Sequence, residues 1–168
     1  TLSEIKSNVK DLDELSGLMG SLKYIAHSGN WSPEEVISNG GGMCRDQNGT
    51  FAVYMLKEAL GYTHAFSLTF ANSKDIVPHT VAVGINPQGN IVVVDYEKIY
   101  ETEYKYKGPE SVNDAILKLY PTVLATQYGR SQTLAHIYDY FRTPMMNLTA
   151  LQPKPVAVPD AQQPVAAP

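Results

Sequence analysis

The sequence predicts an α+β fold in which helices precede a small antiparallel sheet. Helical periodicity covers about the first sixty residues, and a strand-like alternation replaces it between residues 64 and 96. The change of period falls at Gly61, where a helix-terminating glycine is expected. The third observation is a single cysteine, Cys44, which follows three glycines and opens one of the helical segments.

The first helical segment spans residues 2–25, where apolar side chains recur at intervals of three and four. We expect Gly17 and Gly20 to divide it into two helices. Residues 32–35, Ser-Pro-Glu-Glu, form a strong helix start, with Ser32 as N-cap and Glu35 completing a capping box.

Glycines 40–42 are expected to end that helix and to turn the chain into the next one. From Cys44 to Leu60 the apolar pattern is again helical. Three strands then follow, over residues 64–70, 79–85 and 91–96. The turn Asn-Pro-Gln-Gly-Asn at 86–90 should join the last two in an antiparallel hairpin.

After the strands, a tyrosine-rich connection containing Tyr100, Tyr104 and Tyr106 should lead to a helix near 109–120. A further helix is expected from Ser131 to about Arg142. Residues 151–168 are rich in proline and alanine without apolar periodicity. We therefore predict one domain over 1–150 and a tail or linker over 151–168, which could tether another module or join a larger assembly.

Composition excludes several classes of function. The net charge of −4 gives no reason to expect nucleic acid or an anionic membrane as partner. No apolar run approaches the ~20 residues of a membrane-spanning helix. One cysteine cannot form an intramolecular disulfide or a multi-thiolate metal site, and the histidines show no ligand spacing, so we expect no metal and no cofactor. The start at Thr1 and the proline- and alanine-rich tail favour an exported protein.

The setting of Cys44 favours a nucleophile over a buried structural thiol. A helix start stabilises a thiolate through its unpaired N–H groups, and the preceding glycines allow close approach to the sulfur. Asp46, in the same first turn, is interpreted as an ordinary helix-start residue. A nucleophilic thiol needs a base and a group that orients the base.

His79 and Asp95 are the candidates for these two roles. They begin and end the predicted hairpin strands, so the hairpin would bring both to its open end. His79 would accept the thiol proton and later protonate the leaving group, while Asp95 would fix its tautomer. His64 could reach the same site but lacks an acidic partner, and His27 and His136 fall in segments expected to be helical.

The oxyanion formed on attack also needs hydrogen-bond donors. The backbone N–H of Cys44 is the natural first donor. The side chain of Asn39 or the indole of Trp31, both shortly upstream, is a candidate for the second. Trp31 could equally pack as a hydrophobic staple before the helix that Ser32 starts.

These motifs together resemble the transglutaminase-like superfamily of the papain-like fold. The resemblance lies in GGMCRDQNGTFAVYMLKEALGY, HTVAVGIN and IVVVDY, and covers about residues 36–100. It implies a papain-like core, in which a nucleophile-bearing helix packs on a small antiparallel sheet and further helices follow. It assigns the nucleophile to Cys44, the base to His79 and the orienting carboxylate to Asp95. Position 96 departs from the family, because a tyrosine stands where proline or glycine is frequent.

The superfamily leaves three functions open. The first is a cysteine hydrolase of peptide or other amide bonds, acting through a thioester acyl-enzyme. The second is an acyltransferase, because GGMCRDQNGTF is also similar to arylamine N-acetyltransferases and the superfamily includes protein-crosslinking transglutaminases; Gly40 departs from the arginine of the N-acetyltransferases. The third is a noncatalytic binding module that keeps the fold.

Overall fold

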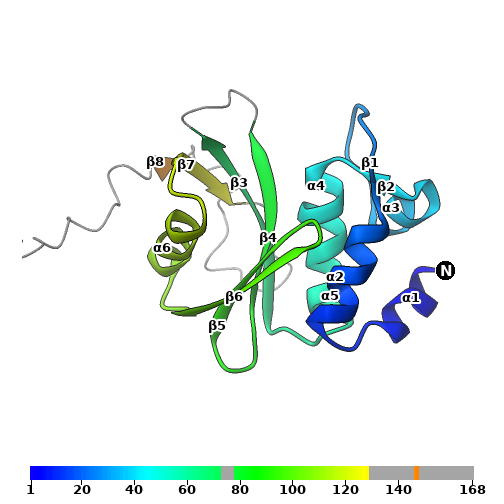
Figure 1. The fold of residues 1–168 in the computed structure, drawn as a ribbon, viewed down its shortest axis with the longest axis horizontal. Coiled ribbons are helices and arrows are strands. Elements are labelled where there is room, and N and C mark those ends of the chain that lie inside the picture. The colour runs from blue at the N-terminus through cyan, green and yellow to red at the C-terminus, as the bar shows by residue number, and fades with distance from the viewer. Residues whose placement is uncertain (73–77, 129–145, 148–168) are drawn as a thin grey trace, which may run out of the picture.

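The computed structural model describes residues 1–72, 78–128 and 146–147 and confirms the α+β class. Figure 1 shows three layers: the N-terminal helices cover one face of a central sheet, and α6 lies on its other face. The helical elements are α1 (Leu2–Asn8), α2 (Leu12–Ser21), α3 (Pro33–Asn39), α4 (Cys44–Asp46), the π-helix η1 (Gln47–Ala52), α5 (Val53–Glu58) and α6 (Pro109–Leu119). The strands are β1 (Lys23–Tyr24), β2 (Gly41–Gly42), β3 (His64–Asn72), β4 (His79–Ile85), β5 (Asn90–Asp95), β6 (Lys98–Lys105), β7 (Val123–Tyr128) and β8 (Met146–Asn147).

The break between the first two helices was placed wrongly by the sequence. It falls between Asn8 and Leu12, whereas Gly17 and Gly20 lie inside α2. The Asp11 side chain accepts a hydrogen bond from the Glu14 backbone N–H at 2.8 Å and so caps a new helix. A glycine inside a helix costs only about 0.5–1 kcal/mol, which this cap and the burial of Leu15 offset.

The start and end of α3 are confirmed. The Glu35 N–H donates to Ser32 Oγ at 3.3 Å, and the Ser32 N–H donates to Glu35 Oε2 at 2.7 Å, which together form the expected capping box. Gly40 ends the helix in the left-handed region, at φ 73°. The two following glycines then form β2, which pairs in parallel with β1 and was not predicted.

The helix that begins at Cys44 runs without interruption to Glu58, but its second part is a π-helix, η1. Here the Thr50 hydroxyl donates to the Arg45 carbonyl oxygen at 3.2 Å, a side-chain bond that spans the wider turn. Gly61 adopts φ 65° as expected, and its N–H donates to the Lys57 carbonyl oxygen at 3.2 Å, which closes the helix in an αL motif. A π-turn at this place is typical of functional sites.

The sheet has six strands among the described residues, in the order β6-β5-β4-β3-β7-β8, and every neighbouring pair is antiparallel. The three predicted strands are β3, β4 and β5, and the hairpin between the last two is confirmed, with Gly84 opposite Val92. The tyrosine-rich connection is wrong in part: residues 98–105 form β6, which pairs along β5. The predicted helix at 109–120 is α6.

Two separate cores stabilise the layers. Towards α1–α5 the sheet presents small side chains such as Ala65 and Ala82, which let the helix from Cys44 approach closely. Towards α6 it presents Phe66 and Leu68, which pack with Ile116 of that helix. The alternation that predicted the strands therefore reports burial on both faces.

Several expectations lie outside the described residues. These are the helix from Ser131 to about Arg142, the surroundings of His136, and the tail over 151–168. The domain boundary at 150 therefore stays a prediction. Within the described part of the chain, no helix is long and apolar enough to cross a membrane.

Two glycine-to-alanine substitutions should distinguish a glycine that a close backbone contact requires from a glycine that only lowers helix propensity. A Cβ at Gly41 would lie 1.9 Å from the Lys23 carbonyl oxygen, whereas a Cβ at Gly17 meets nothing within 4 Å. Gly41→Ala should force β1 and β2 apart and lower the thermal unfolding temperature. Gly17→Ala is the control and should stabilise by roughly 0.5–1 kcal/mol, because it improves helix propensity. An unfolding temperature unchanged by Gly41→Ala would contradict this account of the β1–β2 ladder.

Candidate active site

Cys44 is the first residue of α4 and is half-buried. The extended backbone of Met43 leads into the helix, and its N–H donates to the Asp46 carboxylate at 2.9 Å. The thiol therefore lies at the positive end of a helix that runs through three consecutive elements, which favours the thiolate.

His79 and Asp95 are brought together at the open end of the β4–β5 hairpin. His79 Nε2 and Asp95 Oδ1 are 2.7 Å apart. Since Nε2 is engaged, Nδ1 is the ring nitrogen left for the hydrogen bond that His79 makes with Cys44. The second oxygen of Asp95 accepts a hydrogen bond from the Tyr120 hydroxyl at 2.7 Å. Tyr120 follows α6, and nothing in the local sequence pattern indicated this contact.

The electrostatics of these three groups favour a thiolate–imidazolium pair. Burial acts to raise the pKa of the Cys44 thiol, but the hydrogen bond and charge of His79, helped by the backbone of Thr80, lower it below its ordinary value. Burial acts to lower the pKa of His79, but its hydrogen bonds to Asp95 and Cys44 and their charges raise it from 6.5 to about 9. Against burial, the bond to His79 also lowers the pKa of Asp95.

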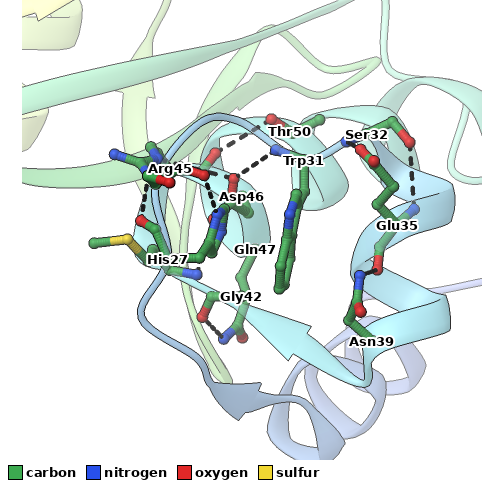
Figure 2. A network of polar contacts seen from close by, with 12 residues as sticks. His27, Trp31, Ser32, Glu35, Asn39, Gly42, Arg45, Asp46, Gln47 and Thr50 are labelled. Carbon is green, nitrogen blue, oxygen red and sulfur yellow. Dashed lines mark hydrogen bonds and ion pairs between the residues drawn. The ribbon is translucent and has the colours of Figure 1, made fainter.

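Three consecutive buried polar residues, Asp46, Gln47 and Asn48, attach this helix to its surroundings. Figure 2 shows the first two of them. Asp46 accepts hydrogen bonds from His27 Nε2 at 2.7 Å and from the Trp31 N–H at 2.9 Å, besides that from Met43. The interpretation of Asp46 as an ordinary helix-start residue was therefore incomplete, because its fully buried carboxylate also holds the segment before α3.

Gln47 and Asn48 attach the helix to both sheets. Gln47 Nε2 donates to the carbonyl oxygens of Lys23 in β1 and Gly42 in β2, at 2.9 and 2.8 Å. The Asn48 amide donates to the Thr80 carbonyl oxygen at 2.9 Å, and its oxygen accepts from the Tyr96 N–H at 2.8 Å. Asn48 therefore binds the backbone directly after His79 and directly after Asp95.

Of the two side chains expected as oxyanion donors, Asn39 is bonded within its own helix and Trp31 stacks on another ring. Asn39 Nδ2 donates to the Glu35 carbonyl oxygen at 2.7 Å, within its own helix. The Trp31 ring stacks on the imidazole of His27, with centroids 3.7 Å apart and planes 7° from parallel. Their role in catalysis stays a prediction without a contact to support it.

The other described histidines differ from expectation. His64 pairs with Ile85, at the opposite end of β3 and β4 from His79, so it cannot reach the site. His27 is not helical; it lies in the connection between β1 and α3, and its backbone oxygen accepts from Arg45 Nη2 at 3.0 Å. A run of three polar residues inside an apolar helical pattern was the signal that could have revealed this network.

Within the described part of the chain, no group of three or more His, Cys, Asp or Glu side chains could hold a metal ion. The carboxylates of Asp46 and Asp95 are instead taken up by hydrogen bonds from His27 and His79.

Comparison with known proteins shows the fold. No protein-family model matches the chain, and no curated protein matches it. Among solved structures, calcium-bound LapG of Legionella pneumophila aligns with a TM-score of 0.52 and 15% identity, over 83% of this chain and 85% of that one. EGTA-treated LapG aligns with a TM-score of 0.51 and 15% identity, over 90% and 81%. The chain therefore shares the overall fold of LapG.

Replacing Asp95 by asparagine should test the coupling within the site. Without the carboxylate charge, the pKa of His79 should fall from about 9 towards its ordinary 6.5. The measurement is an NMR titration of the His79 ring protons. Tyr120→Phe is the control, since it removes a hydrogen bond to Asp95 but leaves the charge. A His79 titration that is unchanged in Asp95→Asn would contradict the pairing.

Proposed function

We propose that the protein is a cysteine-dependent hydrolase of amide bonds, a peptidase or amidase of the transglutaminase-like type. The observation that carries the proposal is the chain of contacts from Cys44 through His79 to Asp95. A base within reach of a nucleophile, oriented by a third group, is the arrangement that covalent acyl transfer requires. The fold shared with LapG agrees with this proposal, and the activity rests on the site.

The reaction proceeds in two halves. The Cys44 thiolate attacks the carbonyl carbon of the amide, and the C–N bond breaks as the His79 imidazolium donates its proton to the leaving nitrogen. This leaves a thioester on Cys44, a released amine and a neutral imidazole. His79 then accepts a proton from water as the water oxygen attacks the thioester, which releases the carboxylic acid and restores the thiolate and the imidazolium.

Each group has a physical reason for its role. Asp95 stabilises the imidazolium and directs the other ring nitrogen of His79 to the sulfur. The Tyr120 hydroxyl satisfies the second oxygen of Asp95, so the half-buried carboxylate keeps a fixed orientation. The backbone N–H of Cys44 is the first donor for the oxyanion, because it lies at a helix start with no partner inside the helix.

One LapG structure is described as calcium-bound. In this chain the carboxylates of Asp46 and Asp95, the described ones near Cys44, accept hydrogen bonds from protein groups. The same proposal includes a peptide or another amide as the substrate and an exported location. It also includes a role of the tail in a larger assembly.

An acyltransferase differs from a hydrolase only in the acceptor that attacks the thioester. The similarity of GGMCRDQNGTF to arylamine N-acetyltransferases supports an acyltransferase as the second candidate function. An amine in place of water at the second half-reaction would yield a new amide from the same residues.

Iodoacetamide should label Cys44 faster near neutral pH than it labels a free thiol, and Cys44→Ala should abolish turnover of a panel of peptide, isopeptide and acyl-donor substrates. Cys44→Ser is the matched variant that keeps the side-chain size.

Added amines should leave product formation unchanged for a hydrolase and raise it for an acyltransferase. Labelling no faster than that of a free thiol would sink the proposal and leave a binding module as the function.

Turnover should follow a bell-shaped pH profile. The acidic limb reports ionisation of the Cys44 thiol and should lie below the ordinary thiol value of 9.0. The alkaline limb reports loss of the His79 proton and should lie near pH 9. Activity is therefore present between the two limbs and lost on either side. In Asp95→Asn the alkaline limb should move to lower pH; a limb that stays in place would exclude His79 as its source.

A further inference from the structure

Tyr96 has a backbone conformation that its side chain disfavours. Its φ is 54°, and it is the one non-glycine residue with positive φ in the described ranges. A left-handed conformation costs an L-residue free energy, and such outliers persist where the surrounding structure enforces them. Tyr96 also occupies the position directly after Asp95 where proline or glycine is frequent in the superfamily that the sequence resembles.

The surrounding structure holds Tyr96 in that conformation. The Tyr96 N–H donates to Asn48 Oδ1 at 2.8 Å, and Asn48 is fully buried one helical turn after Cys44. The same Asn48 amide binds the carbonyl oxygen of Thr80, next to His79. The chain therefore turns sharply after Asp95 at a point that is fixed relative to both the nucleophile and the base.

This turn directs the tyrosine side chain into the reacting site. Its ring lies 5.9 Å from the His79 ring, centroid to centroid. Its hydroxyl interacts with the Cys44 sulfur, and this interaction contributes to a raised pKa of Tyr96. A hydroxyl beside an ionised sulfur acts as the donor, since the thiolate has no proton to give.

We propose that Tyr96 is a further catalytic residue of the site, whose hydroxyl donates a hydrogen bond to the Cys44 thiolate and holds it ionised in the free enzyme. The strained backbone is the structural condition for this contact, because an extended residue at position 96 would carry its side chain elsewhere. The inference rests on the proposed function, in which Cys44 is the nucleophile, and adds the Tyr96 hydroxyl to the donors that face the sulfur, which are His79 and the backbone N–H groups of Thr80 and Arg45.

The contact has two opposite effects on reactivity. Charge-assisted hydrogen bonds favour the thiolate, so Tyr96 increases the ionised fraction at low pH. A thiolate of lower pKa is intrinsically less nucleophilic, so the same contact slows attack once ionisation is complete. Burial, together with the negative charges of Cys44 and Asp95, raises the pKa of Tyr96, which keeps the hydroxyl protonated and able to donate.

The test is the pH dependence of Cys44 alkylation by iodoacetamide in the full chain, for the wild type, Tyr96→Phe and Tyr104→Phe. Tyr96→Phe keeps the ring and removes only the hydroxyl, whereas Tyr104 lies on β6 and is 36% exposed, so its variant is the matched control. The other groups that act on the sulfur, His79 and the backbone of Thr80 and Arg45, are present in all three proteins, as is Asp95 behind His79. Thermal unfolding checks that the variants fold alike.

Tyr96→Phe should raise the thiol pKa by roughly one unit, so alkylation on the acidic limb becomes about tenfold slower. On the alkaline plateau the variant should react up to about threefold faster, so its profile crosses that of the wild type. Tyr104→Phe should coincide with the wild type. Loss of packing alone would slow labelling at every pH without a crossing and would overturn the inference.

The two proposals fail differently. If wild-type Cys44 is reactive and Tyr96→Phe gives the same profile, the role of Tyr96 is overturned and the proposed function stands. If no substrate is turned over but the profiles cross as described, the hydrogen bond to the thiolate stands and the hydrolase proposal is overturned.

Discussion

The site depends on the hydrogen bonds of three consecutive side chains, Asp46, Gln47 and Asn48. Each is buried, and each bonds the nucleophile helix to a different part of the chain. A buried polar group without a partner costs about 1–3 kcal/mol, so every one of these contacts favours a single position of the helix. The position of the Cys44 sulfur relative to the sheet follows from them.

Asn48 has the most direct consequence for the chemistry. Its one amide group binds the backbone next to His79 and the backbone next to Asp95, two positions that are sixteen residues apart in the chain. Asn48 therefore helps to fix the relative positions of Cys44, His79 and Asp95 through the neighbouring backbone. For the proposed hydrolase, this fixed arrangement is the preorganisation that electrostatic catalysis needs.

The packing of the sheet also fixes the position of the helix that begins at Cys44. The face towards the helices carries alanines, valines and glycine, and a Cβ at Gly84 would lie 2.7 Å from the Tyr62 ring. The helix can therefore lie close enough for Asn48 to reach β4, while the larger side chains Phe66, Leu68 and Phe70 are buried against α6 on the other face. Phe70 also packs against the His79 ring in a T-shaped arrangement, at 5.5 Å between centroids.

The sequence by itself did not reveal β1 and β2, but it determined that helices precede the strands β3, β4 and β5, that the last two form a hairpin, and that Cys44, His79 and Asp95 are candidates. These follow from local rules: capping at Ser32, alternation in the strands, and a cysteine at a helix start. Only the tertiary structure decided the rest. Pairing along β5 made residues 98–105 a strand, capping by Asp11 moved the first helix break, and the roles of Asp46, Asn48, Tyr96 and Tyr120 arise from partners far away in the chain. A local pattern reports which face of an element is apolar, but not which distant group will satisfy a buried amide or carboxylate, and this site is built from such pairs.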